Sequence, residues 1–138
     1  MKINILGFIL LLSSLLFASF SKTGNIVTDS NTSLQWQDDS NANSNPKTWT
    51  VAVDDCNSLT LDSLSDWRLP NKKELMSIVD FSIDNPAIDG NFTNTRSDNY
   101  WTSTTYSADI NDSFYVNFNI GSVSSNKKTQ SMYVRCVR

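Results

Sequence analysis

Residues 66–75, DWRLPNKKEL, contain the signals that begin a helix. Pro70 fixes the entry of the chain, and Asn71 and Glu74 have the spacing of a capping box. Residues 80–86 contain the exit from the helix. The apolar side of this short helix is predicted to consist of Leu75, Ile78 and Val79.

A second helix is predicted on the N-terminal side of this stretch. Thr48 can cap it, and its apolar residues recur at helical spacing on one face. Those residues are Trp49, Ala52, Val53, Cys56 and Leu59. The polar run 38–46 before this helix is predicted to be a surface loop. Residues 25–29 and 34–37 are predicted to be short strands around a turn at 30–33.

The C-terminal part of the chain changes to the two-residue period of strands. Residues 100–104 are a predicted strand, residues 114–120 are a second, and Gly121 turns the chain after it. Residues 132–137 are predicted to form the last strand. This order predicts an α+β domain in which Trp49, Val53, Leu75 and Ile78 pack both helices on one face of an antiparallel sheet.

The composition limits the classes of protein that fit. The chain has 138 residues and a net charge of −3, which allows one domain and argues against nucleic acid as a partner. It contains no histidine, so histidine-based triads and histidine metal sites are excluded. Thirteen Asp, sixteen Asn and twenty-one Ser favour turns, and therefore predict a loop-rich domain.

The N-terminus has the pattern of a secretory signal peptide. Met1 and Lys2 give a positive start, residues 3–17 are mostly apolar, and small residues follow from Ala18 to Ser21. We expect residues 1–21 to be removed and residues 22–138 to form a single periplasmic or extracellular domain. A membrane anchor is the alternative, but the apolar run is shorter than the ~20 residues that a span requires. The protein is then expected to contact a membrane only through the signal peptide before cleavage.

The two cysteines are predicted to form a disulfide. Export places them in an oxidising compartment, where paired cysteines are the rule. Cys56 lies on the apolar face of the first helix, and Cys136 shares a face with Val134 in the last predicted strand. In the chain-entropy model, closing a loop of this length stabilises the fold by about 4–5 kcal/mol.

Four segments together resemble the Lcl C-terminal domain family of bacteria. They are Thr48–Cys56, Asp66–Leu75, Tyr100–Thr104 and Tyr133–Arg138, and Val27–Asp29 with Leu34–Gln37 resembles the family's opening hairpin. The resemblance implies a C-type lectin-like fold, related more distantly to the formylglycine-generating enzymes, with a disulfide from a helix to the last strand. The chain departs from the calcium-binding lectins, because residues 84–86 and 110–112 match their calcium motifs only in part.

The resemblance implies an exported, non-catalytic binding or adhesion module of the bacterial envelope, whose partner is a glycan or a surface protein. The alternatives are a small periplasmic accessory protein and a carboxylate-dependent enzyme. No cofactor is expected, although calcium in the aspartate-rich loops is an alternative. Trp67 and Trp101 are expected in the core, with a sugar-stacking platform as the alternative.

In lectin-like domains ligands bind to long loops beyond the second helix, and the matching regions here are residues 82–99 and 107–112. Arg96 is their only cation, so neutral or cationic partners are favoured over polyanions. The alternative is that these residues form solvated turns. The predicted binding residues are Asp84, Asn85, Asp89, Asn91, Arg96, Asp98, Asp109 and Asp112.

Overall fold

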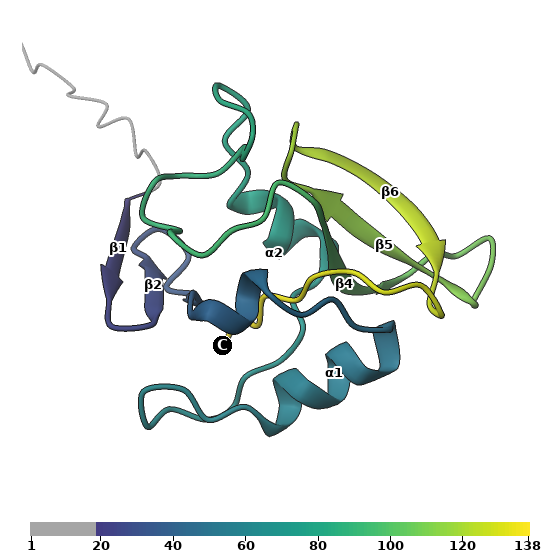
Figure 1. The fold of residues 1–138 in the computed structure, drawn as a ribbon, viewed down its shortest axis with the longest axis horizontal. Helices are drawn as coiled ribbons and strands as arrows, with labels where there is room; N and C mark the ends of the chain where they lie inside the picture. Colours follow the sequence, from purple (N-terminus) through teal and green to yellow (C-terminus); the bar gives the residue numbers. More distant parts are fainter. Residues whose placement is uncertain (1–18) are drawn as a thin grey trace, which may run out of the picture.

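A computed structural model describes residues 19–138 (Figure 1), so most of the expected signal peptide lies outside the described residues. The order of elements confirms a mixed α+β fold. The elements are β1 Phe20–Thr23, β2 Ile26–Asp29, β3 Gln35–Gln37, the 3-10 helix η1 Ser40–Asn43, α1 Trp49–Ser58, α2 Lys72–Ser77, β4 Asn99–Thr105, β5 Asp112–Asn117 and β6 Ser122–Lys127.

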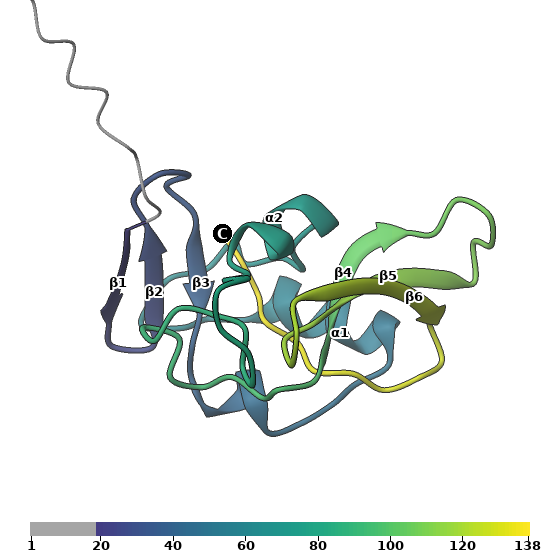
Figure 2. The ribbon, with the colours of Figure 1, turned by 90° about the horizontal axis from the view of Figure 1, so that it is seen from above.

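The strands form two antiparallel three-stranded sheets, β1-β2-β3 and β4-β5-β6, and not the single expected sheet. Figure 2 shows the two sheets side by side, with the C-terminal segment running between them. This segment was expected to be a strand at 132–137, but it changes partner along its length. Tyr133 bonds to the backbone of β4, whereas Cys136 and Arg138 bond to β3. A segment shared by two sheets therefore makes isolated bridges instead of one ladder.

Two apolar clusters lie on opposite faces of β2 and β4. Consecutive strand residues point to opposite faces, and here both faces are buried, since Trp101 enters one cluster and Tyr100 the other. The first cluster consists of Ile26, Ala52, Cys56, Leu61, Trp67, Leu69, Trp101, Met132, Val134 and Cys136. The second consists of Val27, Trp36, Leu75, Ile78, Ile88, Phe92, Tyr100, Val116, Phe118 and Val137.

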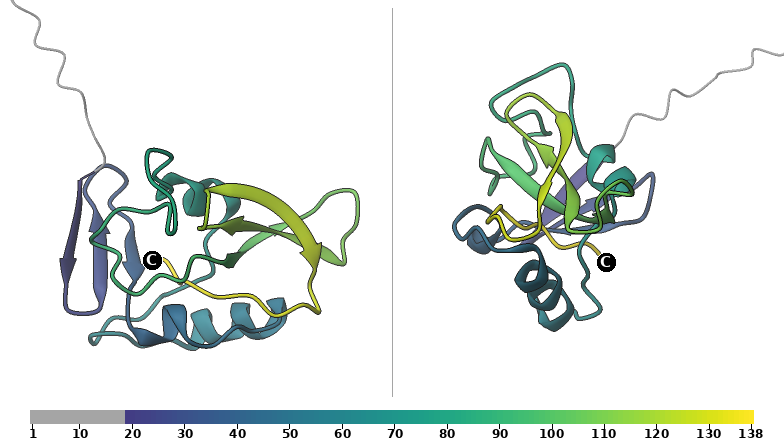
Figure 3. Two further views of the ribbon diagram at one scale, coloured as in Figure 1. Left: turned by 45° about the horizontal axis from the view of Figure 1, so that its top comes forward. Right: turned by 90° about the vertical axis from the view of Figure 1, so that its right-hand side faces the viewer.

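The helices consequently belong to different clusters, and the expectation that both cover one face of a sheet is wrong. Trp49 and Val53 of α1 pack against the first cluster, while Leu75 and Ile78, in and just after α2, are part of the second. Figure 3 shows α1 and α2 on different sides of the C-terminal segment. Trp67 and Trp101 are buried in the first cluster, as predicted, and are not available for stacking on a sugar.

The two helix starts differ in how their backbone N–H groups are satisfied. Asn71 and Glu74 form the predicted capping box, with reciprocal hydrogen bonds of 2.9 and 2.8 Å. Thr48 occupies the N-cap position of α1, but its side chain makes no capping bond. The N–H of Trp49 donates instead to the carbonyl of Lys128 (3.0 Å), which attaches α1 to the chain after β6.

The predicted disulfide is confirmed. Cys56 of α1 and Cys136 of the C-terminal segment are bonded, with their Cα atoms 5.4 Å apart, and both are buried in the first cluster. The disulfide joins two segments that are 80 residues apart in the chain. It holds α1 against the segment that connects the two sheets.

Candidate functional site

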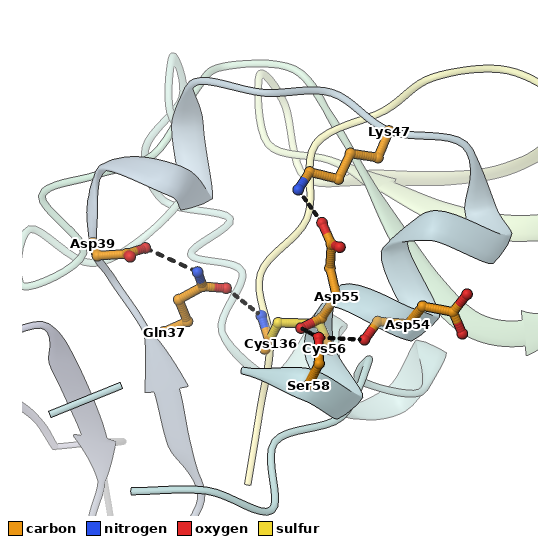
Figure 4. Close-up of a disulfide and its surroundings, with 8 residues drawn as sticks. All are labelled: Gln37, Asp39, Lys47, Asp54, Asp55, Cys56, Ser58 and Cys136. Carbon is orange, nitrogen blue, oxygen red and sulfur yellow. Dashed lines mark hydrogen bonds and ion pairs between the residues drawn. A yellow bond between two sulfur atoms is a disulfide. The ribbon is translucent and has the colours of Figure 1, made fainter. Parts of the chain in front are cut away.

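A hollow of about 320 Å³ opens beside the disulfide. Figure 4 draws the disulfide with several of the residues that line this hollow. Its apolar lining comes from Leu59, Val134 and Cys136, so the base of the hollow belongs to the first cluster. The polar lining comes from Gln37, Asn41, Lys47, Asp55, Ser58 and Thr60. The size and the mixed lining suit a small polar molecule.

The polar groups around this hollow mostly bind one another. The carboxamide of Gln37 accepts from the N–H of Cys136 (3.0 Å) and donates to Asp39 Oδ1 (2.8 Å). Lys47 and Asp55 form an ion pair, drawn in Figure 4. A ligand in this hollow would therefore have to share or displace these partners. We interpret the hollow as a consequence of packing around the disulfide.

A buried polar network fixes the loop that carries several predicted binding residues. Arg135 is fully buried and donates to Asp38 Oδ1 (2.8 Å), to the carbonyl of Asn94 (2.9 Å) and to Thr95 Oγ1 (2.8 Å). Asp38 in turn accepts from the N–H groups of Thr93 and Asn94 at 2.9 and 3.1 Å. The loop at 92–96 is thus attached both to Asp38, just after β3, and to the C-terminal segment.

The charge state of this network follows from its contacts. Burial by itself raises the pKa of Asp38. The Arg135 charge and hydrogen bonds from Arg135, Lys22 and Asn94 outweigh burial, so the pKa of Asp38 is lowered below its ordinary value. Asp38 is therefore an anion held between two cations, which is a structural role.

The predicted binding residues on the segment between α2 and β4 lie on its surface, and several bind their own backbone. Asp84 and Asn85 are exposed, and the N–H of Asn85 donates to the carbonyl of Asn119 (2.8 Å). Asp89 Oδ1 accepts from both the backbone and the side chain of Asn91, each at 2.8 Å. These bonds are typical of aspartate turns.

Arg96 and Asp98 lie further along the same segment and are also exposed. The N–H of Arg96 donates to the Tyr100 hydroxyl (2.9 Å), and Asp98 Oδ1 accepts from the N–H of Asn99 (2.7 Å). The Arg96 N–H and the Asp98 carboxylate thus hold the chain as it enters β4.

Asp109 and Asp112 belong to a different place, the loop between β4 and β5 and the start of β5. Lys127 lies 2.6 Å from Asp109 Oδ2 and 3.0 Å from Asp112 Oδ1. Hydrogen bonds from Lys127 and from Asn111 lower the pKa of Asp109 to about 2. The position between these carboxylates is already taken by an ammonium group.

The eight predicted residues therefore do not converge on one point. In Figure 1 the loop after α2 stands at the top of the molecule and the β4–β5 loop at its right-hand end. Over residues 19–138, no group of three acidic or sulfur-bearing side chains is arranged to hold a metal ion. The candidate surface is best described as two loop regions, with the one after α2 carrying most of the predicted residues.

Three exposed apolar residues in or beside this loop were not predicted from the sequence: Phe81, Ile83 and Ile120. Ile120 was expected in a strand at 114–120, but β5 ends at Asn117 and Ile120 lies in the following turn. Phe81 and Ile83 fall in residues 80–86, which were predicted as the helix exit, and Ile83 also lies in the predicted binding region 82–99. No alternation or helical spacing marks any of the three as exposed.

The fold and its surface define a disulfide-bonded α+β domain with rigidly attached polar loops. The chain belongs to the Lcl C-terminal domain family, whose model matches residues 25–138. Comparison with curated proteins gave no match. Within residues 19–138, none of the helices has the length and apolar character needed to cross a bilayer.

Proposed function

We propose that this protein is an exported, non-catalytic binding or adhesion module of the bacterial envelope. Its fold is of the C-type lectin-like kind, and it recognises a glycan or a protein partner through its loops. Membership of the Lcl C-terminal domain family supports the proposal. The disulfide is compatible with an oxidising compartment outside the cytoplasm.

The observation that carries the proposal is the rigid attachment of an exposed loop surface to the core. Hydrogen bonds to the buried Arg135 and Asp38 fix residues 92–96 to the core. A backbone hydrogen bond from Asn85 to Asn119 fixes the loop after α2. Polar side chains are thereby presented on a backbone that loses little conformational freedom when a partner binds. Such preorganisation favours recognition, because ordering the surface does not reduce the affinity.

Three kinds of side chain that often act in catalysis are absent or have structural roles here. The chain has no histidine, and both of its cysteines are in the disulfide. Glu74, the single glutamate, receives two hydrogen bonds from Arg68 (2.8 and 2.7 Å) and completes the capping box of α2. The lowered pKa of Glu74 follows mainly from its hydrogen bond with Arg68, together with the bond from Asn71 and the Arg68 charge, against an opposing effect of burial.

A glycan array tests the proposal on the purified, oxidised protein, with calcium and with a chelator. We expect saturable binding that falls at least tenfold in Asp84→Ala/Asp89→Ala or in Asp109→Ala/Asp112→Ala, since these pairs sample the two loop regions. Asp54→Ala on α1 is the matched control and should bind like the parent protein. Binding neither to the array nor to the peptide library described below would contradict the proposal.

A further inference from the structure

Three large apolar side chains project from one edge of the molecule. Phe81, Ile83 and Ile120 are 71%, 47% and 61% exposed, and together with Ser82 and Asp84 they line one surface hollow. Phe81 also lines a neighbouring hollow, so the apolar surface continues past the loop. We call Phe81, Ile83 and Ile120 the Phe81 patch. Exposed apolar residues that gather in this way mark interaction sites more often than isolated ones do.

The loop that carries Phe81 is rigidly attached at both ends. The N–H of Asp80 donates to the carbonyl of Ala87 (3.0 Å), and the N–H of Ala87 donates to the carbonyl of Phe118 (2.7 Å). In Figure 1 this loop and the β5–β6 turn stand together at the upper edge of the molecule. The Phe81 patch is therefore held on a fixed backbone and is not a product of a loose loop.

The turn at Gly121 supports the ring of Phe81. Gly121 has a φ of +78°, and a Cβ at this position would lie 2.6 Å from Val79 Cγ1 and 3.1 Å from Phe81 Cε1. Only glycine allows the turn to approach so closely while keeping this backbone conformation. The close contact explains how the Phe81 ring can be ordered although most of its surface faces solvent.

The surroundings of the patch are acidic. Asp80, Asp84 and Asp89 line the two hollows, and no lysine or arginine is among the described residues that line them. Hydrogen bonds from the hydroxyl and the N–H of Ser82 lower the pKa of Asp80. The patch is therefore an apolar surface with a rim of aspartate side chains.

This charge distribution selects among possible occupants. A second copy that docked symmetrically through the same face would bring the aspartates of both copies together, which is unfavourable. An anionic lipid surface would be repelled for the same reason. A partner with complementary charge must carry cations, and a partner that fills the space between Phe81, Ile83 and Ile120 must carry an apolar side chain.

We propose that the Phe81 patch binds a protein segment that presents a bulky apolar side chain flanked by lysine or arginine. This inference rests on the proposed function, because it names the partner of the same binding module. The apolar side chain enters between Phe81 and Ile120, and the flanking cations pair with Asp80, Asp84 and Asp89.

A random dodecapeptide phage library tests the assignment on the purified, oxidised protein, with counter-selection on Phe81→Ser. We expect the enriched peptides to combine an aromatic or large aliphatic residue with neighbouring lysine or arginine. A synthetic peptide of the consensus should lose at least tenfold in affinity against Phe81→Ser and Ile120→Ser. Asp84→Asn should lose severalfold and show a weaker dependence on salt.

Ile110→Ser is the matched control, because Ile110 is 75% exposed but lies on the β4–β5 loop. It should bind within twofold of the parent protein. Equal losses in Ile110→Ser and Ile120→Ser, or enriched peptides without cations, would overturn the assignment. Ile83→Ser repeats the test should Phe81→Ser fail to fold, as judged by near-ultraviolet circular dichroism.

Two further measurements separate the other occupants. Sedimentation that shows a dimer lost in Phe81→Ser would make the patch a self-interface, and co-sedimentation with phosphatidylcholine–phosphatidylglycerol vesicles lost in Phe81→Ser would make it a lipid surface. Either result would overturn this inference. Glycan binding that persists while no peptide binds would overturn it too, yet leave the proposed function standing.

Discussion

Arg135 Nη1 lies 2.8 Å from Asp38 Oδ1, and neither side chain has any exposure to solvent. The pair joins the residue that follows β3 to the C-terminal segment that runs between the two sheets. Arg135 also lies near the rings of Phe92 and Tyr100, at 5.0 and 5.9 Å from their centroids. One buried cation thus connects parts of the domain that are distant in the chain.

Replacing Arg135 by methionine should lower the free energy of unfolding by about 3–5 kcal/mol, since it leaves the Asp38 charge buried with only Lys22 as a cationic partner. Urea unfolding followed by tryptophan fluorescence measures the loss. Arg68→Met is the matched control, because Arg68 pairs with Glu74 at a partly exposed site and should cost about 1 kcal/mol or less. Equal losses in the two variants would contradict a special role for the buried pair.

The same carboxylate predicts a loss of stability in acid. The pKa of Asp38 is lower in the folded protein than its ordinary value. The stability that this group contributes is therefore fully present above about pH 4 and is lost as the pH falls through the folded-state pKa. We expect the free energy of unfolding to change little between about pH 7 and 5 and to fall steeply from about pH 4 to 2.

Asp38→Asn identifies the contribution of this residue. The variant should be less stable at neutral pH, and its stability should fall less steeply between about pH 4 and 2. Asp62, Asp80 and Asp109 also have lowered pKa values, so some acid dependence will remain. Parallel pH profiles for the parent and the variant would show that Asp38 is not the responsible group.

Local signals in the sequence predicted local structure well. The capping box of Asn71 and Glu74 depends only on residues three positions apart, and it forms as predicted. The helical spacing that put Cys56 on an apolar face also placed its sulfur near the last segment of the chain. The capping box follows from local spacing, whereas the disulfide was predictable because the chain has two cysteines and export would place them in an oxidising compartment.

The pairing of strands was not predictable in this way. β6 has a polar sequence, SVSSNK, and becomes a strand because it pairs with β5 along its whole length. Residues 132–137 alternate like a strand, but backbone bonds to both sheets divide them between two partners. Tertiary contacts outweighed the local pattern in both segments.

The candidate site shows the same division. The predicted binding regions 82–99 and 107–112 lie mostly at the surface, because Asp and Asn favour turns. The run 38–46, also predicted to be a surface loop, instead contains the buried Asp38 and the helix η1. Their pairing with Lys127, and the exposure of Phe81, depend on which segments fold beside them. Composition could identify the loops but not the apolar patch.

Removing the disulfide with Cys56→Ala/Cys136→Ala should lower the free energy of unfolding by about 4–5 kcal/mol, because the unfolded chain is released from a loop that spans 80 positions. Urea unfolding of the oxidised parent protein and of the double variant gives the difference. Alkylation of the native, non-reduced protein should detect no free thiol. Two reactive thiols, or a difference below about 1 kcal/mol, would contradict the prediction.

For the exported protein that we propose, the start of β1 predicts where the mature chain begins. Phe20 pairs with Asp29 of β2, and its ring lies edge-on to Phe92 with centroids 5.2 Å apart. The carbonyl of Ser19 accepts a hydrogen bond from the N–H of Ser30 (3.1 Å). Cleavage after residue 21, the expected boundary, would remove these contacts, whereas cleavage after Ala18 would keep all of β1.

Oxidised protein that begins at Ser19 should therefore be more stable than protein that begins at Lys22, by about 1–2 kcal/mol for the lost apolar burial and aromatic contact. Urea unfolding of the two forms measures the difference, and Phe20→Ala in the longer form should account for most of it. Mass spectrometry of the exported protein should then find Ser19 as its first residue. A mature N-terminus at Lys22, with equal stability of the two forms, would show that β1 is dispensable and that the boundary expected from the sequence is correct.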